Sequence, residues 1–378
     1  MAQKLHVAVV GAGAFGGWTA LHLLRRGLRI TLLDAWGPGN SRASSGGETR
    51  IIRATYGPEG IYTRMAARGL QLWKEHEARW GRPLFKRTGV LWMANPKNDG
   101  FARSALPHLR EAGIPHQELS RVELEKRWPQ INFEGITWGI HEPEAGFLFA
   151  RMACQAVLDA FLAEGGEYKQ AAVLPFDSDK ANRGGLQLSD GTALNADQYV
   201  FACGPWLKQL FPELLGGNLK ITKQEVFFFG TPAGDDRFSE AMFPAWADLG
   251  GRFMYGIPGN QARGFKIADD TRGPEFDPTS GERAASPESL RTARAYLAFR
   301  FPALKGAPLL ETRVCQYENT PDHHFIADRH PEHQHIWLVG GGSGHGFKHG
   351  PAIGEMMADL VTERMAPNPI FGLARFRK

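Results

Sequence analysis

Near the N-terminus the chain reads Val7-Ala-Val-Val10-Gly11-Ala-Gly13-Ala-Phe-Gly16. Its first four residues are an apolar run of the kind that forms a buried parallel strand, and the glycines end that run abruptly. A helix is expected over residues 14–26, closed by Gly27, and a second buried strand over residues 30–33 leads to Asp34. Strand, glycine turn, helix, strand and acid together predict a βαβ unit that binds a dinucleotide.

The three glycines of this turn have separate physical roles. They allow a tight turn, give the backbone access to a pyrophosphate and let the helix pack closely on the strand. Unpaired amides at the helix N-terminus would bind the phosphates, and the carboxylate of Asp34 would accept hydrogen bonds from the adenosine ribose. That carboxylate would repel the 2′-phosphate of NADP. These residues alone do not distinguish NAD from FAD as the bound dinucleotide.

Composition and charge restrict the class of protein. The 378 residues are 43% hydrophobic and 22% charged and contain no apolar run long enough to span a bilayer, so no membrane partner is expected. The net charge of +4 is spread along the chain, which argues against nucleic acid. Three widely spaced cysteines (154, 203 and 315) and the short segment before the first strand favour the cytoplasm.

Downstream of the βαβ unit the pattern is first helical and then extended. Residues 48–56 and 61–73 have helical spacing, interrupted at Gly57-Pro58. Residues 84–93 are rich in β-branched and aromatic side chains and predict a strand. Helical and irregular segments are expected from there to about residue 142.

Sequence patterns typical of a nucleotide-binding domain recur later in the chain. A helix over 150–163, a hairpin at Asp190-Gly191 and a buried strand over 198–202 come first. A strand over 222–229 and the polar region 230–285 predict a separate sheet. Near the end, a strand over 336–339 runs into the glycine-rich turn 340–346, and Pro351 is expected to open a helix to about residue 364.

Several motifs match, in order, those of one flavoprotein family. They are Glu48-Thr-Arg-Ile-Ile-Arg53, Thr88-Gly-Val90, Cys315-Gln-Tyr317, Asp322-His-His-Phe-Ile-Ala-Asp328 with His330-Pro-Glu-His333, and Ser343-Gly-His-Gly-Phe-Lys348. In these residues the chain resembles the monomeric sarcosine oxidase and N-methyltryptophan oxidase family, which are FAD-dependent amine oxidoreductases of the D-amino acid oxidase superfamily. The resemblance spans nearly the whole chain and selects FAD over NAD.

Together, the resemblance and the element pattern predict a mixed α/β (α+β) fold. A Rossmann-like FAD-binding domain is expected to be discontinuous, over residues 1–84, 146–220 and 320–378. A substrate domain with an antiparallel sheet is expected over residues 85–145 and 221–319.

The resemblance also implies a catalytic site rich in cations. Arg53 and Lys348 resemble the pair that holds the substrate carboxylate, a task suited to a guanidinium fork and a point charge. Lys266 resembles the lysine near flavin N5 that assists the reaction with oxygen, where a fixed positive charge stabilises superoxide as it forms. Tyr255 and Tyr317 match aromatic residues that line the substrate pocket.

For the cofactor, the resemblance implies a covalent link. Cys315 resembles the cysteine that forms a thioether with the flavin 8α-methyl, Arg50 the arginine packed against the flavin ring, and Trp206 a flavin-contacting tryptophan. Amides of the glycine-rich turn 340–346 would stabilise the negative charge of the reduced ring. The predicted FAD-binding residues are Gly11, Gly13, Ala14, Phe15, Gly16, Asp34, Ala35, Ser45, Thr49, Arg50, Val173, Ala202, Gly204, Trp206, Cys315, Gly344, Gly346, Phe347 and Lys348.

Two positions depart from the family's pattern. Ser45-Gly46 stands where the family has a pair of histidines, one of which supports flavin attachment, so covalent attachment stays open even though Cys315 is present. Asp270 stands where a histidine is usual, and we expect its carboxylate in the catalytic site to face a cationic or hydroxylated part of the substrate. The substrate is therefore not expected to be simply sarcosine.

These inferences predict FAD-dependent oxidation of the C–N bond of a secondary amine or N-methyl amino acid. A hydride would pass from the carbon next to nitrogen to flavin N5, water would hydrolyse the imine, and O2 would reoxidise the flavin to give hydrogen peroxide. No strong general base is needed if the amine enters neutral, a form that the surrounding cations favour. A dehydrogenase that passes electrons to a quinone or carrier protein, and a flavin-binding protein without amine turnover, remain as alternatives.

The expected partners are small molecules. They are an amino acid or amine that carries a carboxylate, and O2; the protein is predicted to be a monomer. A metal is not expected, because His330, His333 and His335 lie in a polar turn without a cysteine ligand nearby.

Overall fold

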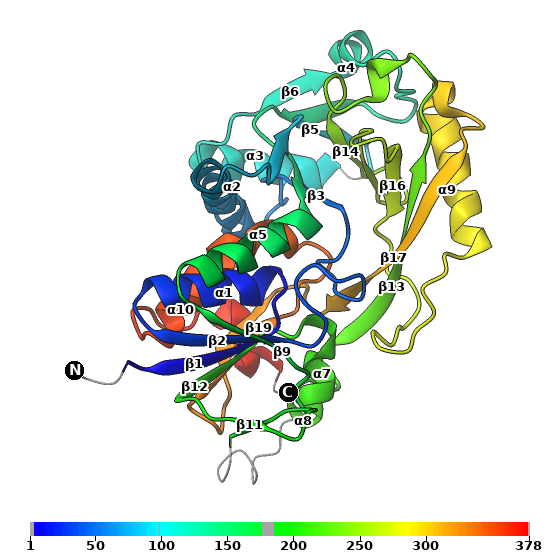
Figure 1. The fold of residues 1–378 in the computed structure, drawn as a ribbon. Coiled ribbons are helices and arrows are strands. Elements are labelled where there is room, and N and C mark those ends of the chain that lie inside the picture. The colour runs from blue at the N-terminus through cyan, green and yellow to red at the C-terminus, as the bar shows by residue number, and fades with distance from the viewer. Residues whose placement is uncertain (1–3, 98, 176–184, 377–378) are drawn as a thin grey trace.

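The computed structural model describes residues 4–97, 99–175 and 185–376. Within these residues the strands form a six-stranded sheet, an eight-stranded sheet and two smaller sheets. Figure 1 shows the two large sheets in different halves of the molecule. The long strands β13 (Lys220–Phe229) and β17 (Leu309–Asn319) run alongside each other from one half towards the other, paired antiparallel.

The six-stranded sheet is built around the N-terminal βαβ unit. Its central strand β1 (His6–Val10) lies between β2 (Arg29–Asp34) and β12 (Gln198–Phe201), parallel to both. These strands are continuous apolar runs because both of their faces are covered. The sheet is extended by β9 (Glu167–Gln170) and β19 (Ile336–Gly340) in parallel, and by β18 (Ile326–Arg329) as an antiparallel edge.

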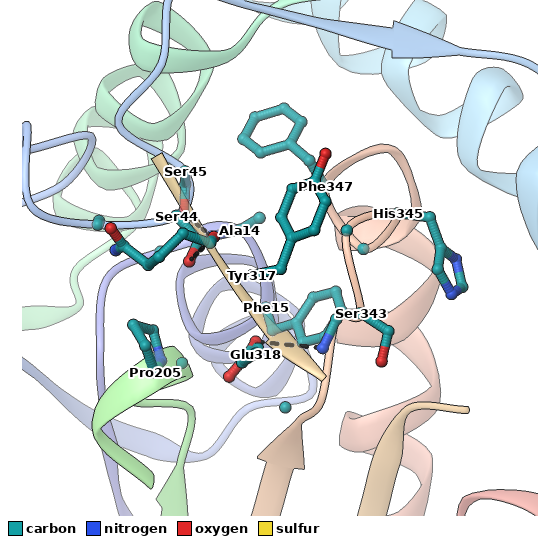
Figure 2. A pocket seen from close by; sticks show the side chains of 18 of the residues that line it. Ala14, Phe15, Ser44, Ser45, Pro205, Tyr317, Glu318, Ser343, His345 and Phe347 are labelled. Atoms are coloured by element: carbon teal, nitrogen blue, oxygen red, sulfur yellow. Dashed lines mark hydrogen bonds between the residues drawn. The ribbon is translucent and has the colours of Figure 1, made fainter. Parts of the chain in front are cut away.

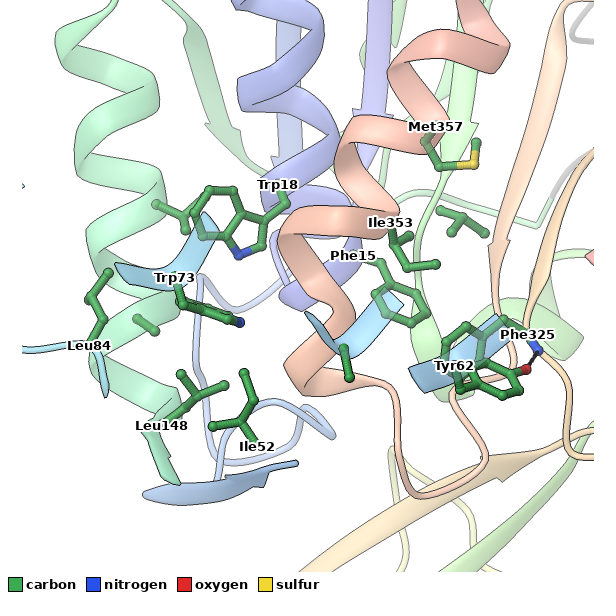
Figure 3. Packing of buried hydrophobic residues seen from close by; sticks show 14 of the residues in the cluster. Phe15, Trp18, Ile52, Tyr62, Trp73, Leu84, Leu148, Phe325, Ile353 and Met357 are labelled. Carbon is green, nitrogen blue, oxygen red and sulfur yellow. Dashed lines mark hydrogen bonds between the residues drawn. The ribbon is translucent and has the colours of Figure 1, made fainter. Parts of the chain in front are cut away.

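Helices cover this sheet and bury its largest aromatic side chains. On one face, α1 (Ala14–Arg25) packs against α5 (Ala150–Ala163) and α10 (Gly350–Val361). Figure 3 shows Trp18 of α1 beside Trp73 of α2 (Gly60–Trp80); their ring centroids are 5.2 Å apart. Each ring that is fully buried in this way contributes roughly 1.5–3 kcal/mol through the hydrophobic effect.

The eight-stranded sheet is antiparallel except where β14 (Ala245–Asp248) and β5 (Val90–Ala94) run in parallel. On one face it is covered by α9 (Pro287–Arg300), which packs on a cluster that includes Phe243, Phe265 and Phe301. In order, its strands are β17, β13, β16 (Phe265–Asp269), β15 (Met254–Ile257), β14 (Ala245–Asp248), β5 (Val90–Ala94), β7 (Trp138–Glu142) and β6 (Gln117–Ser120).

The remaining elements connect these layers. A three-stranded sheet has the order β3 (Thr49–Ile52), β8 (Gly146–Phe149), β4 (Phe85–Arg87), and the predicted hairpin at Asp190-Gly191 joins β10 (Leu186–Gln187) to β11 (Ala193–Leu194). The other helices are α3 (Asp99–Glu111), α4 (Arg121–Arg127), α7 (Leu207–Leu210) and α8 (Pro212–Leu215), with short 3-10 turns such as η1 (Gly204–Trp206) and η4 (Phe347–His349).

Three local predictions were wrong. Residues 48–56 do not form a helix: β3 lies there and pairs antiparallel with β8, because tertiary pairing outweighs a local helical spacing. Residues 84–93 form two strands of different sheets, β4 and β5, separated at Gly89, whose φ of +73° favours glycine. The two strands β6 and β7 lie where helical and irregular segments were expected.

The fold class is confirmed: a Rossmann-like parallel sheet is combined with a largely antiparallel sheet. The domain boundaries stay a prediction. Among the described residues, no helix is both long and apolar enough to cross a membrane.

Candidate functional site

A cavity of about 670 Å³ is lined by residues from both large sheets. The carboxyl ends of β1, β2, β12 and β19 reach it from the six-stranded sheet, which is where ligands bind in sheets of this type. From the eight-stranded sheet it receives side chains of β5, β13, β14, β15, β16 and β17. Its volume is within the ordinary range for a cofactor or substrate site.

The glycine turn after β1 is shaped for a close backbone approach. Gly11 has a φ of +107°, and a Cβ atom there would lie 2.4 Å from the carbonyl oxygen of Ala202. Gly16 does not line the cavity; a Cβ atom there would lie 1.8 Å from the Gly11 carbonyl oxygen, so Gly16 serves the packing of the turn. Glycine is required at both positions for steric reasons.

Asp34 ends β2 and lines the same cavity. One carboxylate oxygen accepts the backbone N–H of Ala12 at 2.8 Å, and the other accepts those of Trp36 at 2.9 Å and Gly37 at 2.8 Å. Burial raises the pKa of Asp34 above its ordinary value. The oxygen that faces Ala12 keeps a lone pair for a further donor, such as a ribose hydroxyl.

Most of the other predicted cofactor residues also line the cavity. Ser45 accepts the backbone N–H of Ala14, the first residue of α1, at 3.2 Å, and Figure 2 shows the two close together. The helix N-terminus therefore opens on the cavity, as binding of a pyrophosphate requires. Gly13, Phe15, Ala35, Val173, Ala202, Gly204, Trp206, Gly344, Gly346 and Phe347 also line the cavity.

Arg50 and Cys315 meet in the wall of the cavity. One guanidinium nitrogen of Arg50 donates to the carbonyl oxygen of Ser44 at 2.6 Å and to the Sγ of Cys315 at 3.4 Å, and the other donates to the carbonyl oxygen of Thr49 at 2.9 Å. Thr49, predicted to bind the cofactor, is buried and does not line the cavity. The structure therefore brings Arg50 and Cys315 to the cavity surface and leaves Thr49 behind them.

Lys266, on β16, is 2% exposed and also lines the cavity. Its Nζ donates to the carbonyl oxygen of Thr49 at 2.9 Å. Burial, and then the nearby charge of Arg50, lower the pKa of Lys266 from 10.5 to about 7.

Arg53 and Lys348 come together around Tyr56. The guanidinium carbon of Arg53 lies 4.1 Å from the ring centroid of Tyr56 and 4.6 Å from that of Trp92, so the guanidinium is held between two aromatic faces. Lys348 Nζ donates to the Tyr56 hydroxyl and to the carbonyl oxygen of His345, each at 2.8 Å. Burial, and then Arg53, lower the pKa of Lys348 well below 10.5.

Three further predicted residues, Tyr255, Tyr317 and Asp270, form one hydrogen-bonded group. The two phenol oxygens lie 3.3 Å apart, and the Tyr317 hydroxyl donates to Asp270 at 2.9 Å. The second carboxylate oxygen of Asp270 accepts from Arg272 at 2.9 Å. Asp270 lines the cavity as expected, but its charge is already balanced by Arg272.

Gly46, at the position of the missing histidine, lies outside the cavity lining. A Cβ atom there would lie 1.9 Å from the carbonyl oxygen of Asn40. The loop therefore has no room for any side chain at Gly46 without moving its backbone.

Sequence reasoning missed several residues of this site. Tyr56, Trp92 and Arg272 contact the predicted cations or Asp270, and Glu142 accepts the backbone N–H groups of Ala54 and Thr55 at 2.7 and 3.0 Å, which fixes the segment after Arg53. Tyr56 follows the motif that contains Arg53 and could have been suspected from that position. Glu142 gave no local sequence signal, because the backbone N–H of Ala54 that it accepts lies 88 residues away along the chain.

Glu318 is another residue that was missed. It lines the cavity between glycine-rich turns, with Phe15, Pro205 and Tyr317 around it in Figure 2. One carboxylate oxygen accepts the backbone N–H of Gly342 at 3.2 Å, whereas the other is buried without a protein partner among the described residues. Burial raises the pKa of Glu318 to about 7. A buried oxygen without a partner at the wall of the cavity fits a ligand that supplies a donor.

The three histidines of the polar turn at 330–335 are not gathered as a metal site. His330 Nδ1 accepts the backbone N–H groups of Glu332 and His333, each at 3.2 Å. Over the described ranges, no group of three or more His, Cys, Asp or Glu side chains is placed to hold a metal ion.

Comparisons with known proteins agree with this geometry. The family model described as FAD dependent oxidoreductase matches residues 6–360. The chain is 31% identical to the monomeric sarcosine oxidase of Bacillus sp. (strain B-0618) over 96% of this chain and 93% of that protein. It is 28% identical to the N-methyl-L-tryptophan oxidase of Yersinia pestis (strain Pestoides F) over 98% of each chain. The crystal structure of L-proline dehydrogenase from P. horikoshii superimposes with a TM-score of 0.83 at 21% identity, covering 100% of this chain and 98% of that one, which shows a shared fold.

These matches confirm the resemblance found in the sequence motifs. The family match covers nearly the whole chain, including the glycine turn, Asp34 and the cavity lining up to Lys348. The chain therefore belongs to the family of FAD-dependent oxidoreductases.

Proposed function

We propose that this enzyme oxidises the C–N bond of a secondary amine or an N-methyl amino acid, with O2 as the electron acceptor and hydrogen peroxide as a product. The observation that carries the proposal is the meeting of Arg53 and Lys348 around Tyr56, in the same cavity as Cys315 and Lys266. This places a pair of cations for a carboxylate beside the residues expected around a flavin ring.

FAD fits this cavity by its dinucleotide end and by its ring end. The N-terminus of α1, Ser45 and Asp34 would hold the pyrophosphate and ribose, and Glu318 offers an oxygen without a protein partner. We propose that Cys315 attaches the flavin covalently, with Arg50 held against its sulfur. When bound, FAD would supply the hydride acceptor for the amine carbon and the electrons for O2.

Arg53 and Lys348 would bind the substrate carboxylate. The Arg53 guanidinium stacks between Tyr56 and Trp92, and one of its terminal nitrogens donates to the carbonyl oxygen of Thr55 at 2.5 Å. Its remaining N–H groups would bind the planar carboxylate. Tyr255 and Tyr317 would line the amine side. Asp270 accepts from the Tyr317 hydroxyl, which in turn contacts the Tyr255 hydroxyl, so both phenols are held in place. Because Arg272 balances the charge of Asp270, we propose that the main role of Asp270 is to hold this wall of the pocket in place. Its contact with a polar part of the substrate would be peripheral.

Lys266 would serve the reaction with O2. A buried ammonium that is fixed by one carbonyl oxygen needs no reorganisation when negative charge develops on oxygen beside it. This role favours an oxidase over a dehydrogenase.

We propose that the protein acts in the cytoplasm. None of the three cysteines forms a disulfide, which suits the reducing cytoplasm. We also propose a monomer, since the Bacillus relative is named a monomeric enzyme. The predicted domain division, with FAD held by 1–84, 146–220 and 320–378, is proposed as well.

An anaerobic panel of amines tests the function. Secondary amines and N-methyl amino acids should bleach the flavin absorbance of the purified protein, and admission of air should restore the absorbance with release of peroxide. Bleaching without peroxide would point to a quinone or protein acceptor. A flavin that no amine bleaches would contradict the proposal.

A further inference from the structure

We propose that Lys348 is the base that takes the proton of the substrate's ammonium group as the substrate binds, so that a zwitterionic amino acid is converted to its reactive neutral amine inside the pocket. The inference rests on the proposed function, because it requires a substrate carboxylate next to Arg53 and Lys348. It adds a second role to a residue that would otherwise serve only as a positive charge.

The hydrogen bonds of Lys348 leave one tetrahedral position of its Nζ free. Two positions are taken by the Tyr56 hydroxyl and the carbonyl oxygen of His345, each at 2.8 Å. Lys348 is 5% exposed and lines the cavity, so the remaining position is the one available to a ligand. In the neutral amine, the lone pair can occupy that position and accept a proton.

The hydroxyl of Tyr56 lies between Lys348 and His349. Its hydroxyl lies 2.6 Å from His349 Nε2, and it has a single proton to donate. If that proton is donated to His349, the phenol oxygen accepts from Lys348. Burial holds the pKa of His349 well below 6.5, which keeps the imidazole neutral and able to accept.

The charged groups around Lys348 do not supply a free counterion. Arg53 adds a like charge, and burial keeps the pKa of His345 well below 6.5, so its ring is neutral and supplies no counterion. Asp270 is bound by Arg272 and Tyr317, and Glu142 accepts three hydrogen bonds from the segment 54–55. Among the described residues, no carboxylate pairs with Lys348 within 4 Å, and a buried lysine in such surroundings favours its neutral form.

Binding of the substrate shifts Lys348 from its neutral form to its charged form. A carboxylate between Arg53 and Lys348 supplies the missing counterion and favours the charged lysine, while both cations disfavour an ammonium nearby. The step is a simple proton transfer: the N–H bond of the substrate's R2NH2⁺ breaks, an N–H bond forms on Lys348, and the products are R2NH and Lys348–NH3⁺. Binding of the zwitterion then requires no proton from solvent.

Titration calorimetry of the FAD-loaded protein tests this proposal through proton uptake. The probes are thioether carboxylates, methylthioacetate and benzylthioacetate, in which sulfur replaces the amine nitrogen. At pH 8 in buffers of different ionisation enthalpy, binding should take up about one proton per site, because these ligands bring the carboxylate without an ammonium. Their Kd should rise about tenfold per pH unit above the pKa of Lys348. Binding without proton uptake and with a constant Kd between pH 6 and 9 would overturn the proposal.

The variant Lys348→Arg is the matched control, since a guanidinium keeps the charge and does not lose its proton. It should bind the same carboxylates without proton uptake, and its flavin reduction at low substrate should rise about tenfold per pH unit, because only neutral amine reacts. In the wild type this rate should stay flat between the pKa of Lys348 and that of the free amine. If Lys348→Arg does not bind the ligands, the pH dependence of the wild-type Kd tests the proposal by itself.

Three outcomes separate this inference from its alternatives. Proton uptake that persists in Lys348→Arg and disappears in Asp270→Asn would assign the base to Asp270 and overturn the proposal. Failure of the wild type to bind any of the carboxylates would instead count against the proposed function. Carboxylate binding with amine-driven bleaching, but without proton uptake, would sink the role of Lys348 and leave the proposed function standing.

Discussion

The Nζ of Lys266 lies 2.9 Å from the carbonyl oxygen of Thr49, and 2% of the lysine is exposed. That contact fixes the ammonium group next to Arg50 and Cys315, the residues proposed to contact the flavin. We predict that Lys266→Met slows flavin reoxidation by O2 by roughly 10²- to 10³-fold, since a preorganised charge is lost. Stopped-flow measurement of each half-reaction checks this prediction, and flavin reduction should change far less. Equal slowing of both half-reactions would argue against the role in oxygen activation.

The pH dependence of reoxidation follows from the same lysine. Burial and Arg50 lower the pKa of Lys266 to about 7, so the charged form that serves O2 is lost as the pH rises through that value. The reoxidation rate constant should therefore fall with rising pH, and the negative charge of the reduced flavin would move the midpoint upward. Lys266→Met should have a flat profile over the same range. A wild-type rate that rises with pH would contradict the assignment.

Most of the parallel sheet was predictable from the sequence because β1, β2, β12 and β19 contain short apolar runs, and β1 and β19 lead into glycine-rich turns. β1 and β2 are buried on both faces, and the turn at Gly11 has a steric requirement that few sequences meet. The same reasoning gave a wrong prediction for residues 48–56. Their helical spacing is real, but pairing of Thr49–Ile52 with Gly146–Phe149 decides the structure, and no local pattern reports a partner so far along the chain.

Within the candidate site, too, residues of linear motifs were predictable, and residues whose role depends on distant contacts were not. Residues in linear motifs, such as Arg53 and Lys348, were predicted and do line the cavity. The phenol that joins them, Tyr56, contacts Lys348 across 292 residues, and its role depends on distances that only the fold sets. Residues that act by holding others in place leave little trace in a single sequence.

Gly46 gives a prediction about stability. A Cβ atom there would overlap the carbonyl oxygen of Asn40, so Gly46→Ala should destabilise the protein by about 1–3 kcal/mol as the loop shifts. Gly217→Ala is the matched control, because no atom lies within 4 Å of its Cβ position. Chemical denaturation of both variants measures the difference. Equal stability of the two would show that the loop at 40–46 adapts freely.

Cys315 gives a prediction about flavin attachment. Acid precipitation of the wild type should leave yellow colour in the pellet, and Cys315→Ser should release the flavin into the supernatant. Cys203→Ser is the control, because Cys203 also lines the cavity but burial raises the pKa of its thiol and its Sγ donates to the carbonyl oxygen of Val10. Release of the flavin from the wild type would mean that Cys315 only packs against the ring.

Glu142 should act on the substrate through Arg53. Its two carboxylate oxygens accept the backbone N–H groups of Ala54 and Thr55 and the hydroxyl of Thr55, at 2.7 to 3.0 Å, and it is 1% exposed. In Glu142→Gln an amide N–H must face one of these donors, which should cost about 1–3 kcal/mol of stability and loosen the segment that carries the guanidinium. The Kd of benzylthioacetate should then rise together with the loss of stability.

The exposed neighbour Glu144 supplies the control for that variant. It pairs with Lys74 and Arg87 at the surface, where such pairs contribute little, so Glu144→Gln should change the free energy of unfolding by less than about 1 kcal/mol and leave the Kd unchanged. Denaturation and ligand titration of both variants separate the two effects. If Glu142→Gln loses stability while the Kd stays at the wild-type value, then Tyr56, Trp92 and the carbonyl oxygen of Thr55 hold the guanidinium without help from Glu142, and Glu142 serves only the fold.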